Sequence, residues 1–427
     1  MNEWPDFQIP TEWTLTRMDE LATKLKAGGT PSRQHKGNFG GDIPFVLIED
    51  MTSSGVYLKS TKETITREGL ESCSAWIVPE NTVLLSMYAT IGATAITTFP
   101  VATNQAILAI IPREDCDREY LSFCLQAHKR HLARLNVEST QKNINKGIVS
   151  SFPLPLPPLP EQKKIAHILS TVQRAIEAQE RIIQTTTELK KALMHKLFTE
   201  GLRNEPQKQT EIGPVPESWE VVPLSECAIV QTGIAKGRKV NAKEAVEVPY
   251  LRVANVQDGY LDLTEMKTIT IRKNEQQRFA LQNGDVVLTE GGDFDKLGRG
   301  FIWHGQIDNC VHQNHVFAVR PDTERISSEF FAYQSQSPYG KSYFLSVAHK
   351  TTNLACINTT KLKAFPVLLP PQDQQEDIVE ACSSIDGKIR NATNKKTQLQ
   401  DLFRTLLHEL MTAKTRIREI ELFTPSN

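Results

Sequence analysis

The residues from Cys310 to His315 read CVHQNH and combine side chains that often bind zinc. A strand would place His312 and His315 on opposite faces, which does not suit a shared metal ion. No pair of cysteines or histidines at zinc-finger spacing accompanies them. A loop that contacts DNA is the alternative, because Gln313 or Asn314 can pair with adenine while His315 supports the loop.

The stretch DFDKLG (293–298) begins like a calcium-binding loop, with Asp at its first and third positions and Gly at its sixth. The twelfth position of such a loop is a glutamate, but here it is His304. A loop that is stiffened by aspartate side chains bonded to their own backbone is the simpler interpretation.

The composition is typical of a soluble protein with more than one domain. The chain has 427 residues, of which 39% are apolar and 23% charged. It has no apolar run long enough to cross a membrane, and its N-terminus does not resemble a signal peptide. The seven cysteines form no CxxC pair, which predicts free thiols in the cytoplasm. A net charge of −1 argues against nucleic-acid binding unless the basic residues gather on one face.

A duplication organises the sequence. FPLPLPPLPEQ (152–162) recurs as FPVLLPPQDQQ (365–375), 213 positions later, and ALMHKLFT (192–199) recurs as TLLHELMT at the same offset. Four more pairs follow in the same order: IPTEW with VPESW, DIPFVLIEDM with EVPYLRVANV, NTVLLS with GDVVLT, and NQAILAIIP with QNHVFAVRP. Units of this length are duplicated domains rather than solenoid repeats.

Each half combines a part rich in strands with a long helix. Short β-branched runs over residues 9–150 and 215–362 predict mostly β structure, with short helices at 117–135 and 327–338. After the prolines, a heptad-like apolar stripe predicts a helix of about 40 residues in each half. The stripes are Ile165, Ile168, Val172, Ala175, Ile182, Leu189 and Leu193, then Ile378, Ala381, Ile385, Ala392, Leu399, Leu402 and Leu406. Such helices can bury each other, either as a hairpin within one core or as an antiparallel coiled coil between two β-rich domains.

Short motifs in both halves are shared with a known family. They are GGTPSR (28–33), GDIPFV (41–46), SMYATIGATAI (86–96), ATNQAI (102–107), STQKNINKG (139–147), TEGGDFDKLGRG (289–300) and HQNHVFAVRP (312–321), together with the proline segment of the first half. In this combination the chain resembles, over nearly its whole length, the DNA-specificity subunit of type I restriction–modification systems. The second proline segment departs from the family pattern, with Asp373-Gln374-Gln375 in place of Pro160-Glu161-Gln162.

The resemblance implies an α+β fold with two tandem, mostly β target-recognition domains. Each domain is followed by a long helix, and the two helices pack as an antiparallel coiled coil with pseudo-twofold symmetry. The expected division is an N-terminal recognition domain (1–152), a central helical spacer (153–200), a linker (201–214), a C-terminal recognition domain (215–364) and a C-terminal helical spacer (365–420).

The resemblance also implies which loops contact DNA. In the first domain the loop 26–37 and the motifs that follow present Arg33, Gln34, Lys36, Tyr88, Thr90, Asn104 and Gln105. In the second domain the candidates are Lys296, Arg299, Gln313 and Asn314. The glycines of the loop 289–300, which would let the backbone approach a DNA groove, are Gly291, Gly292, Gly298 and Gly300.

The family's subunit is not catalytic. It reads a two-part, asymmetric DNA target and carries two methyltransferase subunits and the restriction (translocase) subunits. S-adenosylmethionine, ATP and magnesium are then expected on those partners and not on this chain. The sequence agrees, because it contains no [ND]PP[YF] string for a flipped adenine and no GxxxxGK[ST] phosphate loop. Two alternatives stay open: a remnant of a fused methyltransferase–endonuclease, or a coiled-coil adaptor without a DNA role.

Overall fold

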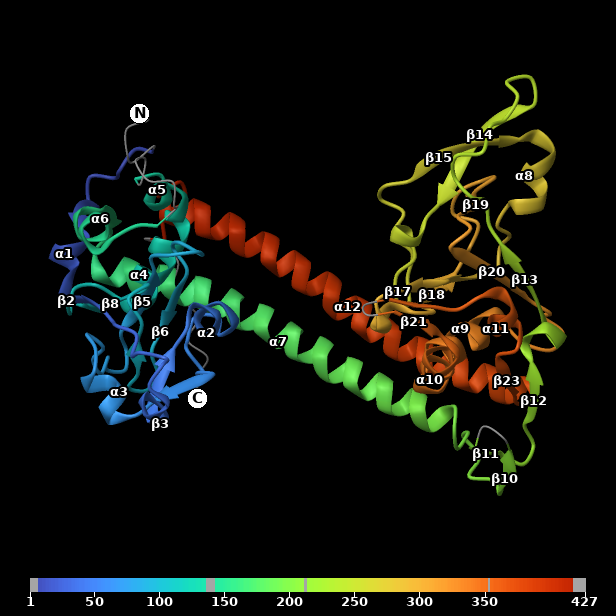
Figure 1. Cartoon of the computed structure of the whole chain (residues 1–427). Coiled ribbons are helices and arrows are strands. Elements are labelled where there is room, and N and C mark those ends of the chain that lie inside the picture. Colours follow the sequence, from blue (N-terminus) through green and yellow to red (C-terminus); the bar gives the residue numbers. More distant parts are fainter. Residues whose placement is uncertain (1–6, 136–142, 211–212, 352–353, 418–427) are drawn as a thin grey trace. The chain divides into compact units, whose positions relative to one another are not determined.

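The computed structural model describes residues 7–135, 143–210, 213–351 and 354–417. The chain forms two compact units (Figure 1). Unit 1 comprises Met1–Arg181 and Ala392–Asn427, and unit 2 comprises Ile182–Asn391. Two long helices, α7 (Leu159–Leu197) and α12 (Gln372–Met411), each contribute one part to each unit. Within the described ranges, no helix has both the length and the apolar character needed to cross a membrane.

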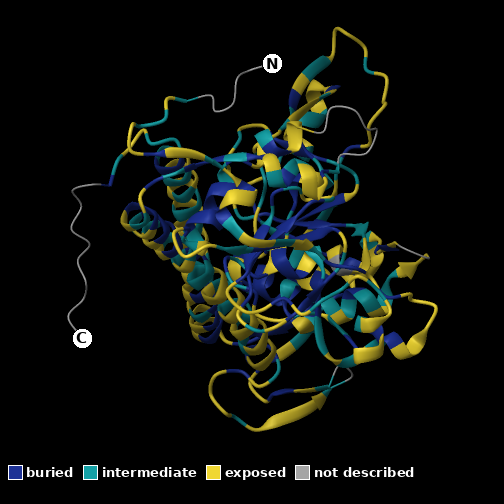
Figure 2. Ribbon diagram, turned by 90° about the vertical axis from the view of Figure 1, so that its left-hand side faces the viewer, coloured by how far each residue is buried: buried dark blue, intermediate teal, exposed yellow. Residues whose placement is uncertain are grey.

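Unit 1 is built on one four-stranded and one three-stranded sheet. The larger sheet has the order β2-β8-β5-β6, with every neighbouring pair antiparallel: β2 (Ala22–Ala27), β8 (Ile107–Pro112), β5 (Val83–Ser86) and β6 (Thr94–Ile96). The smaller has the order β4-β3-β7, with β7 parallel to β3: β4 (Glu63–Ile65), β3 (Phe39–Val46) and β7 (Ala102–Thr103). All four residues of β5 are buried, as its apolar Val83, Leu84 and Leu85 predict for a central strand. Figure 2 shows that buried residues, in dark blue, gather in strands, whereas many loops are exposed.

Unit 2 repeats this topology strand for strand. Its four-stranded sheet is β13 (Ala228–Thr232), β20 (Val316–Pro321), β16 (Val286–Thr289) and β18 (Gly300–Ile302). Its three-stranded sheet is β15 (Lys267–Arg272), β14 (Ala245–Leu251) and β19 (Val311–His312), again with the last strand parallel to the middle one. A third sheet joins β17 (Gly291–Gly292), β22 (Ala355–Cys356) and β21 (His349–Lys350). The shared strand order confirms that the sequence repeat is a domain duplication.

The short helices of the two units also correspond. Those of unit 1 are α1 (Met18–Leu21), α2 (Ile48–Ser53), α3 (Arg67–Glu71), α4 (Arg118–Ala127), α5 (Lys129–Arg134) and α6 (Lys146–Ser151). Those of unit 2 are α8 (Lys273–Phe279), α9 (Ser328–Gln336), α10 (Pro338–Val347) and α11 (Thr359–Lys363). The places of α1 and α2 are taken in unit 2 by the 3-10 helices η2 (Leu224–Glu226) and η3 (Val253–Asn255). The helices predicted within 117–135 and 327–338 are confirmed as α4, α5 and α9. Asn145 and Asn358 cap α6 and α11, which explains why Ile-Asn recurs in both halves.

The repeated proline segments form the entry to the long helices. They contribute β9 (Pro153–Leu156) and β23 (Pro366–Leu369), which pair antiparallel with β1 (Thr14–Arg17) and β12 (Glu220–Pro223). A buried glutamine then follows in each half. Gln162 accepts the backbone N–H of Asp117 at 2.7 Å and donates to the carbonyl of Pro157 at 2.9 Å. Gln375 does the same with Ser327 and Pro370, at 3.1 Å in both bonds.

The altered second proline segment keeps the same contact. Trp13 donates its indole N–H to Glu161 at 3.2 Å, and Trp219 donates to Gln374 at 2.9 Å. At the start of each long helix, a buried tryptophan thus bonds to a polar side chain at the same position of the repeat. This side chain is a charged glutamate in the first half and a neutral glutamine in the second. Such a bond satisfies an indole N–H that burial would otherwise leave without a partner.

The apolar stripes of the long helices are buried in part. Ile165 and Ile378 are 1% and 0% exposed, whereas Ile182, Leu189 and Leu402 are 44%, 59% and 46% exposed. The heptad pattern was therefore wrong in placing these three in a buried seam. In a straight helix, positions seven residues apart shift around the axis by about 20° per heptad. After several turns, the residue that follows a heptad position therefore faces the core in its place. The half-buried neighbours are Ile183, Lys190 and Phe403.

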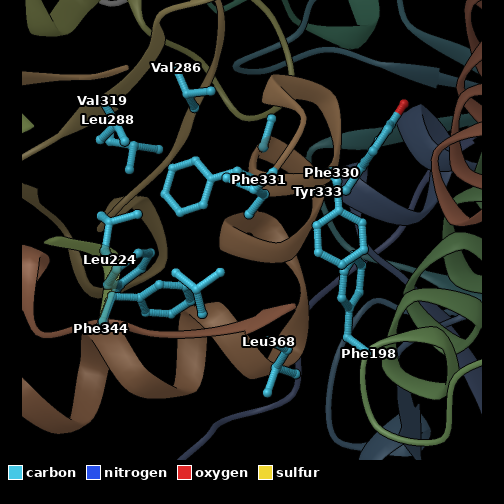
Figure 3. Close-up of a cluster of buried hydrophobic side chains, with 14 of the residues drawn as sticks. Phe198, Leu224, Val286, Leu288, Val319, Phe330, Phe331, Tyr333, Phe344 and Leu368 are labelled. Carbon is cyan, nitrogen blue, oxygen red and sulfur yellow. The ribbon is translucent and has the colours of Figure 1, made fainter. Parts of the chain in front are cut away.

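The ends of the long helices lie in the domain cores. In unit 2, Met194 and Leu197 of α7 and the following Phe198 belong to the main core, where Phe198 contacts Phe330 with ring centroids 5.4 Å apart (Figure 3). In unit 1, Leu410 and Met411 of α12 are buried in the core in the same way. The expected linker 201–214 contains β10 (Gln207–Thr210), which pairs with β11 (Gly213–Pro216).

Candidate nucleic-acid interface

Three segments of unit 1 that carry predicted DNA-contacting residues meet at one edge of its sheets. The loop that follows β2 is bonded to the end of β7, since the N–H of Gly29 donates to the carbonyl of Thr103 at 3.0 Å. The hydroxyl of Thr30 contacts the amide oxygen of Gln105 at 2.6 Å. The N–H of Met87 donates to the carbonyl of Ala106 at 2.8 Å, which brings the turn after β5 to the same place. Separate stretches of sequence thus form one surface.

Two of the predicted residues in unit 1 stabilise this surface rather than projecting freely from it. One guanidinium nitrogen of Arg33 contacts both carboxylate oxygens of Glu63, at 3.1 and 2.9 Å. The central carbon of the guanidinium lies 4.9 Å from the ring centre of Phe39. The side-chain oxygen of Asn104 accepts the N–H of Ala106 at 2.9 Å, which fixes the turn between β7 and β8.

The other predicted residues of unit 1 differ in accessibility. Tyr88 is half-buried and packs against the core. Gln34, Lys36, Thr90 and Gln105 are exposed. These four are the predicted side chains of unit 1 that are best placed to reach a ligand. Part of the motif STQKNINKG, residues 139–142, lies outside the described residues.

Unit 2 assembles the corresponding three segments. Ile234, which follows β13, donates its N–H to the carbonyl of His312 at 2.8 Å. Glu290, at the end of β16, donates its N–H to the carbonyl of His315 at 2.9 Å. Gly28 and Gly233 occupy equivalent places in the two units. A Cβ at either would lie 1.7 or 2.0 Å from the carbonyl oxygen of Thr103 or His312, so the close approach of these segments requires glycine in both units.

The side chains of the β19–β20 turn are partly occupied by the fold. Gln313 is half-buried, and its amide oxygen accepts the N–H of Val253 at 3.3 Å. Asn314 is half-buried, with its amide nitrogen 3.2 Å from Nε2 of His315. His315 is exposed and its Nδ1 contacts the carboxylate of Glu290, which suits the loop-supporting role expected of it. Base contacts by Gln313 or Asn314 would use the hydrogen-bonding capacity that these bonds leave.

His312, which precedes this turn, is buried. Its Nδ1 lies 2.7 Å from the carbonyl oxygen of Val316, and burial lowers its pKa to about 4, so the ring is neutral at physiological pH. His312 is buried whereas His315 is exposed, in agreement with the expectation that the two lie on opposite faces. Among the described residues, no cluster of three or more His, Cys, Asp or Glu side chains could hold a metal ion.

The loop 293–300 is shaped by its own packing. Lys296 forms an ion pair with Asp293, and this hydrogen bond lowers the pKa of the Asp293 carboxyl. Arg299 is half-buried, and its Nε is buried without a hydrogen-bond partner in the described part of the chain. Of the predicted pair, Lys296 is the more accessible.

Packing within the unit also accounts for the glycines of this loop. A Cβ on Gly298, which has φ +64°, would lie 2.4 Å from the ring of Phe344. A Cβ on Gly300 would lie 1.9 Å from the carbonyl oxygen of Val287, and one on Gly291 would lie 2.6 Å from Sγ of Cys356. Close packing inside unit 2 is thus sufficient to require glycine at these three positions, and the approach of DNA to this loop stays a prediction.

The sequence analysis missed the equivalent of the loop 26–37 in unit 2. Because Gly233 corresponds to Gly28, the matching loop is 235–244, and it carries Lys236, Arg238, Lys239 and Lys243. Arg238 forms an ion pair with Glu275 at 2.7 Å, as Arg33 does with Glu63. Aligning the two halves from Gly28 and Gly233, rather than from the prolines alone, would have identified this loop.

Comparison with known proteins connects this arrangement to a family. The model of the type I restriction modification DNA specificity domain matches residues 10–187 and 216–401, which is most of each half. The chain belongs to this DNA-specificity family. The two matched segments coincide with the two halves of the duplication, so the chain carries two copies of the specificity domain.

Members of the specificity family align with nearly the whole chain. The MjaIX specificity subunit of Methanocaldococcus jannaschii is 23% identical, with 97% of this chain and 96% of the relative covered. The MjaVIII specificity subunit of the same organism is 26% identical, with 98% and 96% covered. The crystal structure of a type I S subunit from M. genitalium superimposes with a TM-score of 0.57 at 15% identity, covering 95% of this chain and 96% of that one. That likeness supports the specificity-subunit fold.

Proposed function

We propose that this chain is the DNA-recognition and scaffold subunit of a type I restriction–modification complex and reads a bipartite, asymmetric target. The observation that carries the proposal is the repeated meeting of three loop segments at one edge of each unit. Each unit would contact one half-site. The chain would catalyse no reaction itself and would position partner adenine-N6 methyltransferase and restriction subunits.

The asymmetry of the target follows from the side chains at the two edges. Unit 1 offers the exposed Gln34 and Gln105 beside Thr90. Unit 2 offers Gln313 and Asn314 next to the His315–Glu290 pair. An amide side chain can pair with adenine in the major groove, whereas the surrounding hydrogen bonds fix which of its edges is presented. Because the two units share a topology but present different side chains, they favour two different half-sites.

The scaffold role is assigned to α7 and α12 as an antiparallel coiled coil with pseudo-twofold symmetry. Two features support it: each unit takes the C-terminal end of one long helix into its core, and the helix entries repeat the same hydrogen bonds. On one face of the duplex, the two contact centres would lie about one helical turn, roughly 34–36 Å, apart.

The exposed leucines of the long helices are proposed as docking points for the methyltransferase subunits. Leu189 of α7 and Leu402 of α12 are 213 positions apart, the offset of the repeat, and are 59% and 46% exposed. One exposed leucine on each helix, at the same position of the repeat, would give two copies of one partner equivalent contacts. Restriction subunits would join this assembly.

The cofactors of the reaction are assigned to the partners in this proposal. S-adenosylmethionine, ATP and magnesium would bind to the methyltransferase and restriction subunits. We place the complex in the cytoplasm, and the seven free cysteines of this chain are compatible with a reducing compartment.

Mapping of adenine methylation tests the proposal directly. A genome that carries this gene with its methyltransferase partner should gain methylation at two short half-sites separated by a fixed gap. Exchange of residues 215–362 for the equivalent domain of a relative should change one half-site only. A continuous site, a palindrome or no added methylation would contradict the proposal.

A further inference from the structure

A basic loop of unit 2 begins beside the side chains proposed to read bases. Residues 235–244 join β13 to β14 (Figure 1). The backbone N–H of Ile234 donates to the carbonyl of His312 at 2.8 Å, and the N–H of Asn314 donates to the carbonyl of Ile234 at 3.2 Å. The base of the loop is therefore bonded to the β19–β20 turn, and a ligand that contacts this turn lies within reach of the loop.

The loop concentrates positive charge. Residues 235–244 contain one acidic residue, Glu244, and four exposed basic side chains: Lys236, Arg238, Lys239 and Lys243. The equivalent connection of unit 1, residues 28–38 between β2 and β3, has two basic residues, Arg33 and Lys36, and no acidic residue. The two units therefore differ in the charge that they present beside their candidate base contacts.

One of the four basic residues fixes the loop. Arg238 pairs with Glu275 in the first turn of α8 at 2.7 Å, and this hydrogen bond lowers the pKa of the Glu275 carboxyl. Arg33, the equivalent arginine of unit 1, pairs with Glu63 of β4 instead. Since the guanidinium is already bound to a carboxylate, Arg238 positions the loop. Within the described part of the chain, no ion pair joins Lys239 or Lys243 to a carboxylate.

We infer that residues 236–243 form a phosphate-binding arm, in which Lys239 and Lys243 contact the DNA backbone at the half-site bound by unit 2. Ammonium groups on flexible stems neutralise phosphates without reading bases. Unit 2 would then supply a larger share of the sequence-independent affinity than unit 1. The inference rests on the proposed function, because it requires DNA at the edge formed by Gln313 and Asn314.

The salt dependence of DNA binding tests the arm. The full-length chain is titrated onto a duplex of about 40 base pairs of arbitrary sequence, at KCl concentrations from about 50 to 300 mM, by fluorescence anisotropy. Each lost phosphate contact reduces the slope of log affinity against log salt by about 0.9. Lys239→Gln with Lys243→Gln should therefore reduce it by about 1.8. The affinity at 0.1 M salt should fall by about 60-fold if the two contacts contribute nothing at 1 M.

A matched variant separates the arm from net charge. Lys388→Gln with Lys395→Gln removes the same charge from exposed positions of α12 and should leave the slope unchanged. A wild-type slope in the arm variant, or an equal loss in the α12 variant, would overturn the arm while leaving the proposed function intact. A wild-type chain that binds no duplex at any salt concentration would overturn both. Circular dichroism of each variant verifies that it is folded.

Discussion

The ion pair between Lys190 and Asp386 is expected to couple α7 to α12 within unit 2. Nζ of Lys190 lies 2.6 Å from Oδ1 of Asp386, and the two side chains are only 17% and 24% exposed. The hydroxyl of Tyr333 donates to the other carboxylate oxygen at 2.9 Å. Residue 403, which is 213 positions after Lys190, is a phenylalanine that contacts Phe123 in unit 1, with ring centroids 5.9 Å apart. The repeat thus fills corresponding positions with an ionic group in one half and an aromatic pair in the other.

The magnitude follows from distance and burial. At 2.6 Å and an effective dielectric constant of about 20, the gross attraction is about 6 kcal/mol, and desolvation of both groups offsets most of it. We expect Lys190→Met and Asp386→Asn each to reduce the free energy of unfolding by about 2 kcal/mol. The double variant should lose less than the sum, with a coupling energy of about 1–2 kcal/mol.

A double-mutant cycle in urea, followed by circular dichroism, measures this coupling energy. The control pair is Lys396 and Glu180 in unit 1, which lie 3.2 Å apart and are more exposed. Lys396→Met and Glu180→Gln should couple by less than about 1 kcal/mol, as exposed ion pairs do. A coupling energy for Lys190 and Asp386 no greater than that of the control pair would refute the reasoning.

Three further predictions concern a buried histidine, two glycines and two exposed leucines. Burial lowers the pKa of His312 from its usual 6.5 to about 4. The unfolded chain therefore binds one more proton than the folded chain, and the free energy of unfolding falls as the pH drops from about 7 to 4. His312→Gln should remove up to about 3 kcal/mol of that fall, measured by urea unfolding at several pH values. Gly300→Ala should destabilise unit 2 by more than about 2 kcal/mol, because the added Cβ meets the carbonyl oxygen of Val287. Gly387→Ala, where a Cβ on α12 would meet nothing, should instead stabilise the protein by about 0.5–1 kcal/mol. Equal effects of the two substitutions in thermal melts would contradict this. Leu189→Asp with Leu402→Asp should leave the melting temperature within about 2 °C but abolish co-purification of the methyltransferase subunit, and unchanged co-purification would remove these leucines from the docking surface.

The sequence by itself determined the duplication, the lengths of the long helices and the short helices that precede them. These features are local, or repeat in order along the chain. A few neighbouring residues suffice to predict each of the local features. These are the proline segments, the helix caps at Asn145 and Asn358, and the apolar runs of the strands. The recurrence of Gln162 and Gln375 is visible in the sequence, but the hydrogen bonds that they make are not.

Tertiary structure decided which of the predicted residues are accessible. The heptad stripe could not tell Ile182 from Ile183, because the drift of the helix face accumulates over several turns and depends on what packs against it. Arg33 looked available in the sequence but is bound to Glu63, 30 residues away. The sequence did not show that Gly298 and Gly300 pack against Phe344 and Val287, which by itself requires glycine at both positions. Long-range partners set these outcomes, and a local pattern carries no information about them.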